Sequence, residues 1–223
     1  MSKVRVMHYV NQFFAGIGGE AKADVPFGCF PGPVGPGKRL QELLGDSAEI
    51  VVTVYCGDDY FSKHLDETVA AILQAAREQN IQLLVAGPAF ASGRYGFACA
   101  EVCHAVSSTL GLNCVTGLHL ENPGVETYQQ YKDRMVYAFP TTEEALGMGA
   151  ALSTMARFVS RLTAEASIGT PAEEGYIPRG FRLDKVKSDN GAARAVRLLL
   201  DKIGGRAFVS EIPVENIEAI PVS

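Results

Sequence analysis

The chain has 223 residues, of which 47% are hydrophobic and 20% charged, so it can form a full core and is not expected to be globally disordered. Its formal net charge is −5 and it has no dense basic run, which argues against nucleic acid and anionic membranes as partners. No apolar stretch approaches the length of a membrane span, and Arg5 and His8 interrupt the only apolar segment near the N-terminus. We therefore expect a cytoplasmic protein.

The predicted elements alternate between strands and helices along the chain. Apolar runs predict strands at residues 3–10, 49–55, 81–86, 114–119 and 135–139. Helical spacing predicts helices at residues 38–44, 64–79, 92–110 and 143–166. Ser92 and Thr142 are the expected N-caps of the last two helices. Residues 21–37 contain four prolines and four glycines, which predicts a long loop without regular structure.

This alternation predicts an α/β fold with a doubly wound, mostly parallel sheet of the Rossmann or flavodoxin kind and helices on both faces. Residues 1–166 are the expected substrate-binding domain. Residues 167–223 are expected to form a loop, a basic helix at 192–203 capped by Asn190, and an extended end. Because this segment can bury little surface alone, we expect it to pack on the main sheet or on a partner.

The cysteines do not suggest a disulfide framework, because their number is odd and no C-x-x-C pair occurs. They are Cys29, Cys56, Cys99, Cys103 and Cys114. Cys99 and Cys103 are one helical turn apart beside His104, a spacing that would suit a metal. No second ligand pair accompanies them, so we interpret them as small buried thiols and predict no metal site.

The first strand leads into a glycine-rich loop that ends at Glu20. Such a loop after the first strand of an α/β domain is a usual place for a small anionic ligand. The spacing is not G-x-G-x-x-G and no helical pattern follows, so a nucleotide is not favoured. A tight turn is the simpler alternative, but Asn11, Gln12 and Glu20 add polar groups that a plain turn would not need.

Glycines and polar residues also follow the next three strands, at the sheet edge where open parallel sheets bind ligands. The candidate substrate-binding residues are Asn11, Gly18, Gly19, Glu20, Cys56, Gly57, Asp58, Gly87, Pro88, Arg94, Tyr95, Glu121 and Asn122. No catalytic residue can be assigned among them.

Four of these candidates carry specific chemistry, each with a simpler alternative. Arg94 could bind a carboxylate or phosphate with both guanidinium nitrogens, or it could be a surface arginine. Glu20 and Glu121 could hold a cationic amine, or they could be solvated loop carboxylates. Cys56 could be a nucleophile, although no histidine partner can be assigned, or it could be a buried thiol at a strand end. We expect Arg94 and Glu20 to share one site, because the first and third strands should be neighbours.

Five motifs occur in order over nearly the whole chain. They are His8–Glu20, Cys56–Phe61, Ala86–Phe90 with Gly93–Gly96, Glu121–Val125 and Glu173–Gly180. Together they make the chain resemble the N-terminal half of the substrate-specific selenoprotein B subunit of glycine, sarcosine and betaine reductases.

The resemblance implies reductive cleavage of a C–N bond in a small amino acid or betaine-like substrate. In that family a selenocysteine in the C-terminal half attacks the α-carbon, the carboxymethyl group passes to a small selenoprotein, and a pyruvoyl subunit takes part for glycine. This sequence contains no selenocysteine.

We therefore expect a substrate-binding subunit or half with no cofactor of its own, inactive alone, within an oligomeric complex. The selenocysteine-bearing half or subunit and the pyruvoyl subunit are the expected partners. The alternatives are a non-catalytic assembly subunit, which would use the glycine- and proline-rich loop and the 167–223 segment for contacts, and an unrelated enzyme that depends on Cys56.

Overall fold

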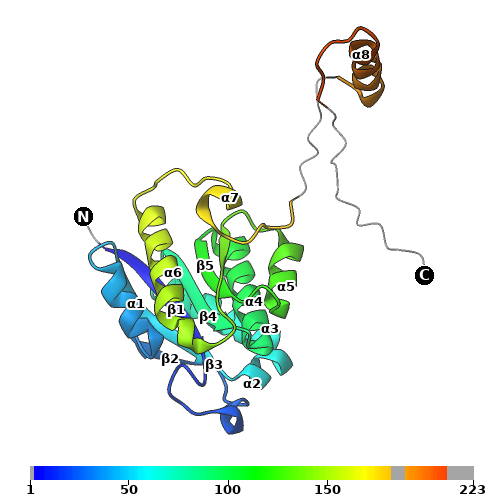
Figure 1. The fold of residues 1–223 in the computed structure, drawn as a ribbon. Helices are drawn as coiled ribbons and strands as arrows, with labels where there is room; N and C mark the ends of the chain where they lie inside the picture. The colour runs from blue at the N-terminus through cyan, green and yellow to red at the C-terminus, as the bar shows by residue number, and fades with distance from the viewer. Residues whose placement is uncertain (1–2, 182–188, 210–223) are drawn as a thin grey trace, which may run out of the picture. The chain divides into compact units, whose positions relative to one another are not determined.

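Six strands form one sheet in the order β2-β3-β1-β4-β5-β6 (Figure 1). The computed structural model describes residues 3–181 and 189–209. The strands are β1 (Val4–Asn11), β2 (Gly28–Pro31), β3 (Ala48–Cys56), β4 (Leu83–Phe90), β5 (Asn113–Leu118) and β6 (Val136–Pro140). The helices are η1 (Glu20–Lys22), α1 (Pro36–Leu44), α2 (Asp58–Lys63), α3 (Leu65–Glu78), α4 (Gly93–Leu110), α5 (Pro123–Tyr131), η2 (Ala145–Gly147), α6 (Met148–Thr163), α7 (Pro171–Glu174) and α8 (Gly191–Ile203).

The five strands other than β2 are parallel, and among themselves they follow the sequence order 2-1-3-4-5. This is the flavodoxin-like order of a doubly wound sheet, so the predicted fold class is confirmed. The strand order reverses between β1 and β4, which pair directly along residues 6–9 of β1. Ligands bind at such a reversal, beyond the carboxyl ends of the strands.

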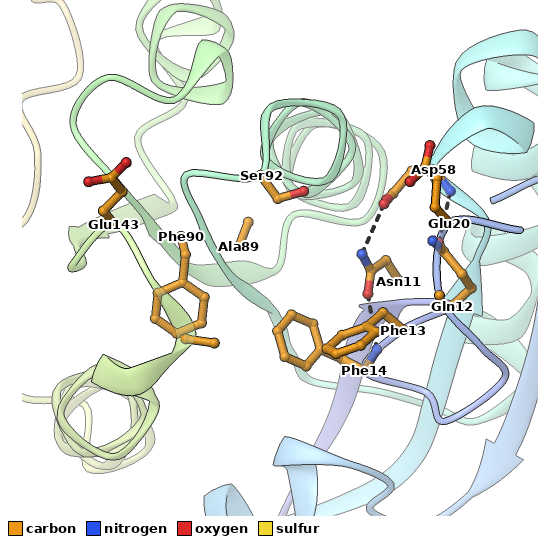
Figure 2. A pocket seen from close by; sticks show the side chains of 12 residues that line it. Asn11, Gln12, Phe13, Phe14, Glu20, Asp58, Ala89, Phe90, Ser92 and Glu143 are labelled. Atoms are coloured by element: carbon orange, nitrogen blue, oxygen red, sulfur yellow. Dashed lines mark hydrogen bonds between the residues drawn. The ribbon is translucent and has the colours of Figure 1, made fainter. Parts of the chain in front are cut away.

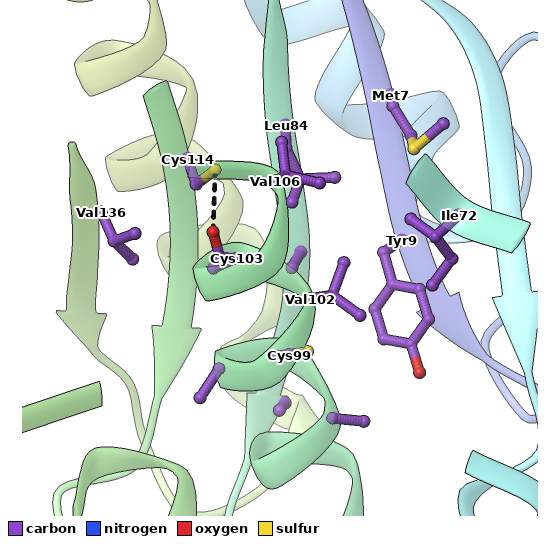
Figure 3. Close-up of a cluster of buried hydrophobic side chains, with 14 of the residues drawn as sticks. Met7, Tyr9, Ile72, Leu84, Cys99, Val102, Cys103, Val106, Cys114 and Val136 are labelled. Atoms are coloured by element: carbon purple, nitrogen blue, oxygen red, sulfur yellow. Dashed lines mark hydrogen bonds between the residues drawn. The ribbon is translucent and has the colours of Figure 1, made fainter. Parts of the chain in front are cut away.

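Side chains of β1 alternate between two apolar cores, one on each face of the sheet. Met7 and Tyr9 pack with residues of α3 and α4, a cluster that includes Ile72 and Val102 (Figure 3). Val6 packs on the opposite face with residues of α1 and α6. Helices thus cover both faces, and the carboxyl ends of the strands lie between the two layers.

The structure corrects the prediction that residues 21–37 lack regular structure. Gly28–Pro31 form strand β2, which pairs antiparallel with Val52–Tyr55 of β3. Proline is tolerated there because β2 is an edge strand, where a missing N–H leaves the rest of the ladder intact.

Other element boundaries also differ from the prediction. β4 continues through Gly87 and Pro88 to Phe90 rather than ending at residue 86, and α2 and α5 were not predicted. The helix predicted at 143–166 begins at Met148, after the short η2. Thr142 does not cap it, because its hydroxyl donates to the Glu144 carbonyl at 3.0 Å.

The chain divides into two compact units, of which the first ends at Phe181 and the second begins at Arg182. In the first unit, Ile177 is buried and its N–H donates to the Ala138 carbonyl of β6 at 2.7 Å. The second unit contains α8, whose N-cap is Asn190 as predicted, through a 2.8 Å bond from the Ala193 N–H. The predicted extended end spans residues 208–222, and all of it after residue 209 lies outside the described residues. No helix within the described parts of the chain is long and apolar enough to cross a membrane.

His8 of β1 is completely buried, and it should make stability depend on pH. Its Nε2 donates to the Gly87 carbonyl at 2.9 Å, while Nδ1 has no hydrogen-bond partner. Burial lowers the pKa of His8 from 6.5 to about 4, with the Gly87 bond opposing that shift.

We expect the chain to lose stability as the pH falls from 6.5 towards 4. In this window His8 is protonated in the unfolded chain but stays neutral in the folded chain, so falling pH favours unfolding. The loss at pH 5 should be about 2 kcal/mol at 1.36 kcal/mol per pKa unit. Urea denaturation at pH 7.5 and pH 5 measures it. A His8→Gln variant should lose this part of the pH dependence, and an unchanged pH dependence in that variant would contradict the assignment.

Candidate functional site

A pocket of about 320 Å³ lies at the carboxyl ends of β1 and β4, where the strand order reverses (Figure 2). This volume is at the small end of the range for small-molecule sites. The lining residues are Asn11, Gln12, Phe13, Phe14, Gly19, Glu20, Asp58, Ala89, Phe90, Ser92, Glu143 and Ala145.

Asn11, the last residue of β1, shapes the loop that forms one wall. Its side-chain oxygen accepts from the Phe14 N–H at 3.1 Å, and its carbonyl accepts from the Ala15 N–H at 2.9 Å. The next carbonyl, of Gln12, accepts from the Ile17 N–H at 3.0 Å. These bonds fold the chain back at once after the strand, so the loop is ordered by polar groups rather than by glycines alone.

The side chains of Asn11 and Gln12 fix Asp58 at the start of α2 (Figure 2). Asn11 Nδ2 donates to Asp58 Oδ2 at 3.0 Å, and the Asp58 N–H donates to Gln12 Oε1 at 3.0 Å. Asp58 is only 5% exposed, and its second oxygen, Oδ1, has no hydrogen-bond partner. Burial raises the pKa of Asp58, while the Asn11 bond and the charge of Arg94 oppose that shift.

Gly57 connects β3 to α2 where another part of the chain lies too close for a side chain. Its N–H donates to the Val25 carbonyl at 2.8 Å, and a Cβ at this position would lie 2.2 Å from the Ala23 carbonyl oxygen. That carbonyl accepts from the Asp59 N–H at 2.8 Å and the Tyr60 N–H at 3.1 Å. Gly57 therefore lets the 23–25 segment hold the first turn of α2, and with it Asp58.

Glu20 and Arg94 come together as the strand order predicts, but they pair with each other. Arg94 Nη2 lies 2.5 Å from Glu20 Oε1, and Nη1 pairs with Asp59. These bonds raise the pKa of Arg94, the Glu20 bond most of all. Glu20 lines the pocket and Arg94 does not. The assignment of Arg94 to a substrate carboxylate therefore stays a prediction.

The opposite wall comes from the end of β4, which Asn122 holds in place. Asn122 is buried, and its Nδ2 donates to the carbonyls of Phe90 at 2.7 Å and Ser92 at 3.0 Å. Its Oδ1 accepts from the Gly124 N–H at 2.9 Å and so caps α5. Phe90 has φ +52°, a conformation that is strained for a bulky residue and is often found at functional sites.

Aromatic and acidic residues make up half of the lining residues. The Phe14 ring lies between those of Phe90 and Tyr95, with centroid distances of 6.5 and 5.8 Å. Every ionisable side chain that lines the pocket is acidic, namely Glu20, Asp58 and Glu143. Aromatic faces and carboxylates together favour a small cationic group.

The remaining predicted residues surround the pocket or lie away from it. Gly18 precedes the lining residue Gly19, and Gly87, Pro88 and Tyr95 are buried beneath the site. Glu121 is exposed and does not line the pocket. The prediction omitted Gln12, Phe13, Phe14, Ala89, Phe90, Ser92, Glu143 and Ala145. Two signals could have found some of them: adjacent phenylalanines in the first loop, and Glu143 just after the last predicted strand.

Four of the five cysteines lie in the core, and none of the five lines the pocket. Cys99, Cys103 and Cys114 are buried with the apolar residues between the sheet and α4, where the Cys114 thiol donates to the Cys103 carbonyl at 3.4 Å (Figure 3). Among residues 3–181 and 189–209, no three His, Cys, Asp or Glu side chains are grouped to hold a metal ion. Cys56 is also buried, and desolvation raises its pKa to about 12. That thiol is a poor nucleophile at neutral pH, so the structure does not favour an enzyme that depends on Cys56.

Alkylation should therefore distinguish Cys29 from the other cysteines. Cys29 is exposed and the other four are buried. We expect iodoacetamide at pH 8 to modify Cys29 in the native chain and to spare Cys56, as measured by peptide mass spectrometry. A Cys29→Ser variant should then take up almost no label until urea is added. Rapid labelling of Cys56 in the native chain would contradict its burial and its raised pKa.

The fold and the pocket define an α/β protein of flavodoxin-like topology with an acidic, aromatic pocket at its switch point. A family model described as glycine/sarcosine/betaine reductase selenoprotein B matches residues 3–223. The chain belongs to this family.

Similar proteins include components of three related complexes. The chain is 46% identical to the glycine reductase complex component B subunit gamma of Carboxydothermus hydrogenoformans, over 99% of this chain and 50% of that protein. It is 38% identical to the sarcosine reductase complex component B subunit beta of Peptoclostridium acidaminophilum, over 99% of this chain and 50% of that protein. It is 36% identical to the betaine reductase complex component B subunit beta of the same organism, over 96% of this chain and 48% of that protein. The chain thus spans about half the length of these relatives. No solved structure matches it.

Proposed function

We propose that this chain is the substrate-binding half of component B of a reductase complex that acts on glycine or an N-methylated glycine. The observation that carries the proposal is the pocket at the switch point, whose ionisable lining residues are all acidic and whose walls carry aromatic rings. The relatives are named for glycine, sarcosine and betaine, which all carry a positively charged nitrogen one carbon away from a carboxylate.

The two ends of such a zwitterion match two parts of the site. The cationic nitrogen fits beside Asp58 and the rings of Phe14 and Phe90. The carboxylate fits towards the first turn of α4, which begins directly after the lining residue Ser92. Helix N-termini attract anions, and the Ser92 side chain makes no capping bond that would occupy these N–H groups.

The chemical step would come from elsewhere in the complex. No cysteine lines the pocket within the described chain, and the sequence contains no selenocysteine. The attacking selenol would be supplied by the half of component B that this chain does not span, and the pyruvoyl group by another subunit. The role of residues 1–181 is then to orient the substrate so that its C–N bond faces that half. The chain alone should release no amine from glycine, sarcosine or betaine in the presence of a dithiol.

Helix α8 supplies a surface for the remaining half. Its apolar residues recur at helical spacing along one side, at Ala192, Ala195, Val196, Leu199, Leu200 and Ile203. Each of the four larger side chains is at least 55% exposed, which is unusual for a stripe of this kind. The family match includes this helix, although the chain spans only half of the relatives' length. We therefore assign the stripe to the other half of component B.

The stripe can be tested by sedimentation with the purified remaining half. Wild type should form a complex, and Leu199→Glu should weaken it, whereas Asp201→Lys, on the opposite side of the helix, should not. Self-association of the wild type that Leu199→Glu abolishes, with no effect on binding of the other half, would contradict the assignment.

Calorimetric titration tests the proposed substrate class. The wild-type chain, alone and with the remaining half of component B, is titrated with glycine, sarcosine and betaine. Two analogues serve as controls: acetate lacks the cationic nitrogen, and methylammonium lacks the carboxylate. We expect at least one zwitterion to bind ten times more tightly than either analogue. Failure of all three zwitterions to bind in both settings would overturn the proposal.

A further inference from the structure

Asp58 is the one carboxylate of the pocket that is both buried and incompletely hydrogen-bonded within the described chain. Its orientation is fixed, since Oδ2 accepts from Asn11 Nδ2 at 3.0 Å and its N–H is held by Gln12 at 3.0 Å. Oδ1 has no partner, although the residue is only 5% exposed. A buried carboxylate oxygen without a donor is unfavourable unless a ligand supplies one.

Within the described chain, no cationic side chain bonds to this oxygen. No lysine, arginine or histidine is among the residues that line the pocket, and the nearby Arg94 is paired with Glu20 and Asp59. The other two lining carboxylates, Glu20 and Glu143, are exposed to solvent, and Glu20 is already in its ion pair. A ligand cation that enters the pocket therefore gains most at Asp58, where water competes least.

We propose that Asp58 Oδ1 accepts a hydrogen bond from the ammonium of the substrate, which makes this site selective for glycine derivatives that retain an N–H over quaternary ammonium compounds. The inference rests on the proposed function and deepens it. A trimethylated nitrogen carries the same charge but has no proton to donate, so it would leave Oδ1 unsatisfied. Sites built to bond a polar hydrogen discriminate strongly against analogues that lack it. The sequence offered Glu20 and Glu121 for this role, and we assign it to Asp58 instead.

The decisive comparison is between N,N-dimethylglycine and betaine, which differ by one methyl group in place of one proton. The wild-type chain, with the remaining half of component B present, is titrated with both ligands and with glycine and sarcosine. We expect dimethylglycine to bind about tenfold to a hundredfold more tightly than betaine, the range given by one charge-assisted hydrogen bond.

Two variants assign that preference to Asp58. Asp58→Asn keeps the shape of the side chain, and the new amide oxygen can accept the bond from Asn11 Nδ2. The amide nitrogen, a donor, then takes the place of Oδ1 and faces the ligand. The preference for dimethylglycine should fall below about threefold in Asp58→Asn, in the range of an ordinary methyl contact. Glu143→Gln removes the same charge from an exposed lining residue. It should weaken all four ligands by a similar factor and leave the preference unchanged.

The possible failures can be told apart. If wild type binds betaine as tightly as dimethylglycine, the role of Asp58 is overturned while the proposed function stands, and this result does not depend on whether Asp58→Asn folds. If a folded Asp58→Asn keeps the wild-type preference, the selecting group is another residue. If none of the four ligands binds wild type, the proposed function itself fails.

Discussion

Gly57→Ala is expected to lower the free energy of unfolding by about 1–3 kcal/mol, the usual result of adding a methyl group where no space exists. The new Cβ would lie 2.2 Å from the Ala23 carbonyl oxygen and 2.7 Å from the Val25 nitrogen. Both contacts are with backbone, so no side-chain rotation relieves them. The 23–25 segment must move, and its bonds to the first turn of α2 must lengthen.

A matched glycine separates this clash from the general effect of adding a methyl group. Gly149 is exposed near the start of α6, and a Cβ there would meet nothing within 4 Å. Gly149→Ala should therefore be neutral or stabilise the chain by up to about 1 kcal/mol, since alanine favours helix. Urea denaturation of both variants measures the difference. Equal stabilities would show that the 23–25 segment is not packed against Gly57.

Asn122→Ala should lower the free energy of unfolding by about 2–4 kcal/mol and also weaken ligand binding. The change removes the cap of α5, usually worth about 1 kcal/mol. It also removes two side-chain hydrogen bonds, each worth about 0.5–1.5 kcal/mol. The two carbonyls keep one backbone donor each, the His119 N–H for Phe90 at 3.0 Å and the Gly96 N–H for Ser92 at 2.8 Å. Because Phe90 and Ser92 line the pocket, loss of these bonds should loosen one wall.

Asn190→Ala is the control for the capping effect. Asn190 also caps a helix, through the Ala193 N–H, but among the described residues its side chain makes no second bond to a strand end. Asn190→Ala should lower the free energy of unfolding by no more than about 1 kcal/mol. Thermal unfolding and ligand titration of both variants provide the measurement. An Asn122→Ala chain as stable as Asn190→Ala, with unchanged ligand affinity, would contradict the role given to Asn122.

The sheet was predictable from the sequence because its signal is local. Buried parallel strands are continuous apolar runs, and the usual crossovers make the first and third of them neighbours, which β1 and β4 are. The edge strand β2 was missed because Gly28 and Pro31 disfavour a strand by composition. Its pairing depends on β3, more than twenty residues away in the sequence.

The site was predictable in position but less so in composition. Asn11 ends β1, Gly19 and Glu20 lie in the loop after it, and Asp58 lies just beyond β3. The strand-end rule finds all four, and all four line the pocket. Phe14 and Phe90 carry no polar signal, and nothing local shows that their rings meet. The pairing of Arg94 with Glu20 could not be foreseen either, because both an ion pair and a shared ligand place opposite charges side by side.

Intermolecular NOE measurements on bound sarcosine test the central claim most directly, in the chain together with the remaining half of component B. If the switch-point pocket holds the substrate with its nitrogen beside Asp58, the N-methyl protons should give cross-peaks to the ring protons of Phe14 and Phe90, which both line the pocket. The stacked rings of Phe30 and Tyr55, near the edge strand, should give none. Cross-peaks from bound sarcosine that omit Phe14 and Phe90 and arise elsewhere in the chain would contradict the account.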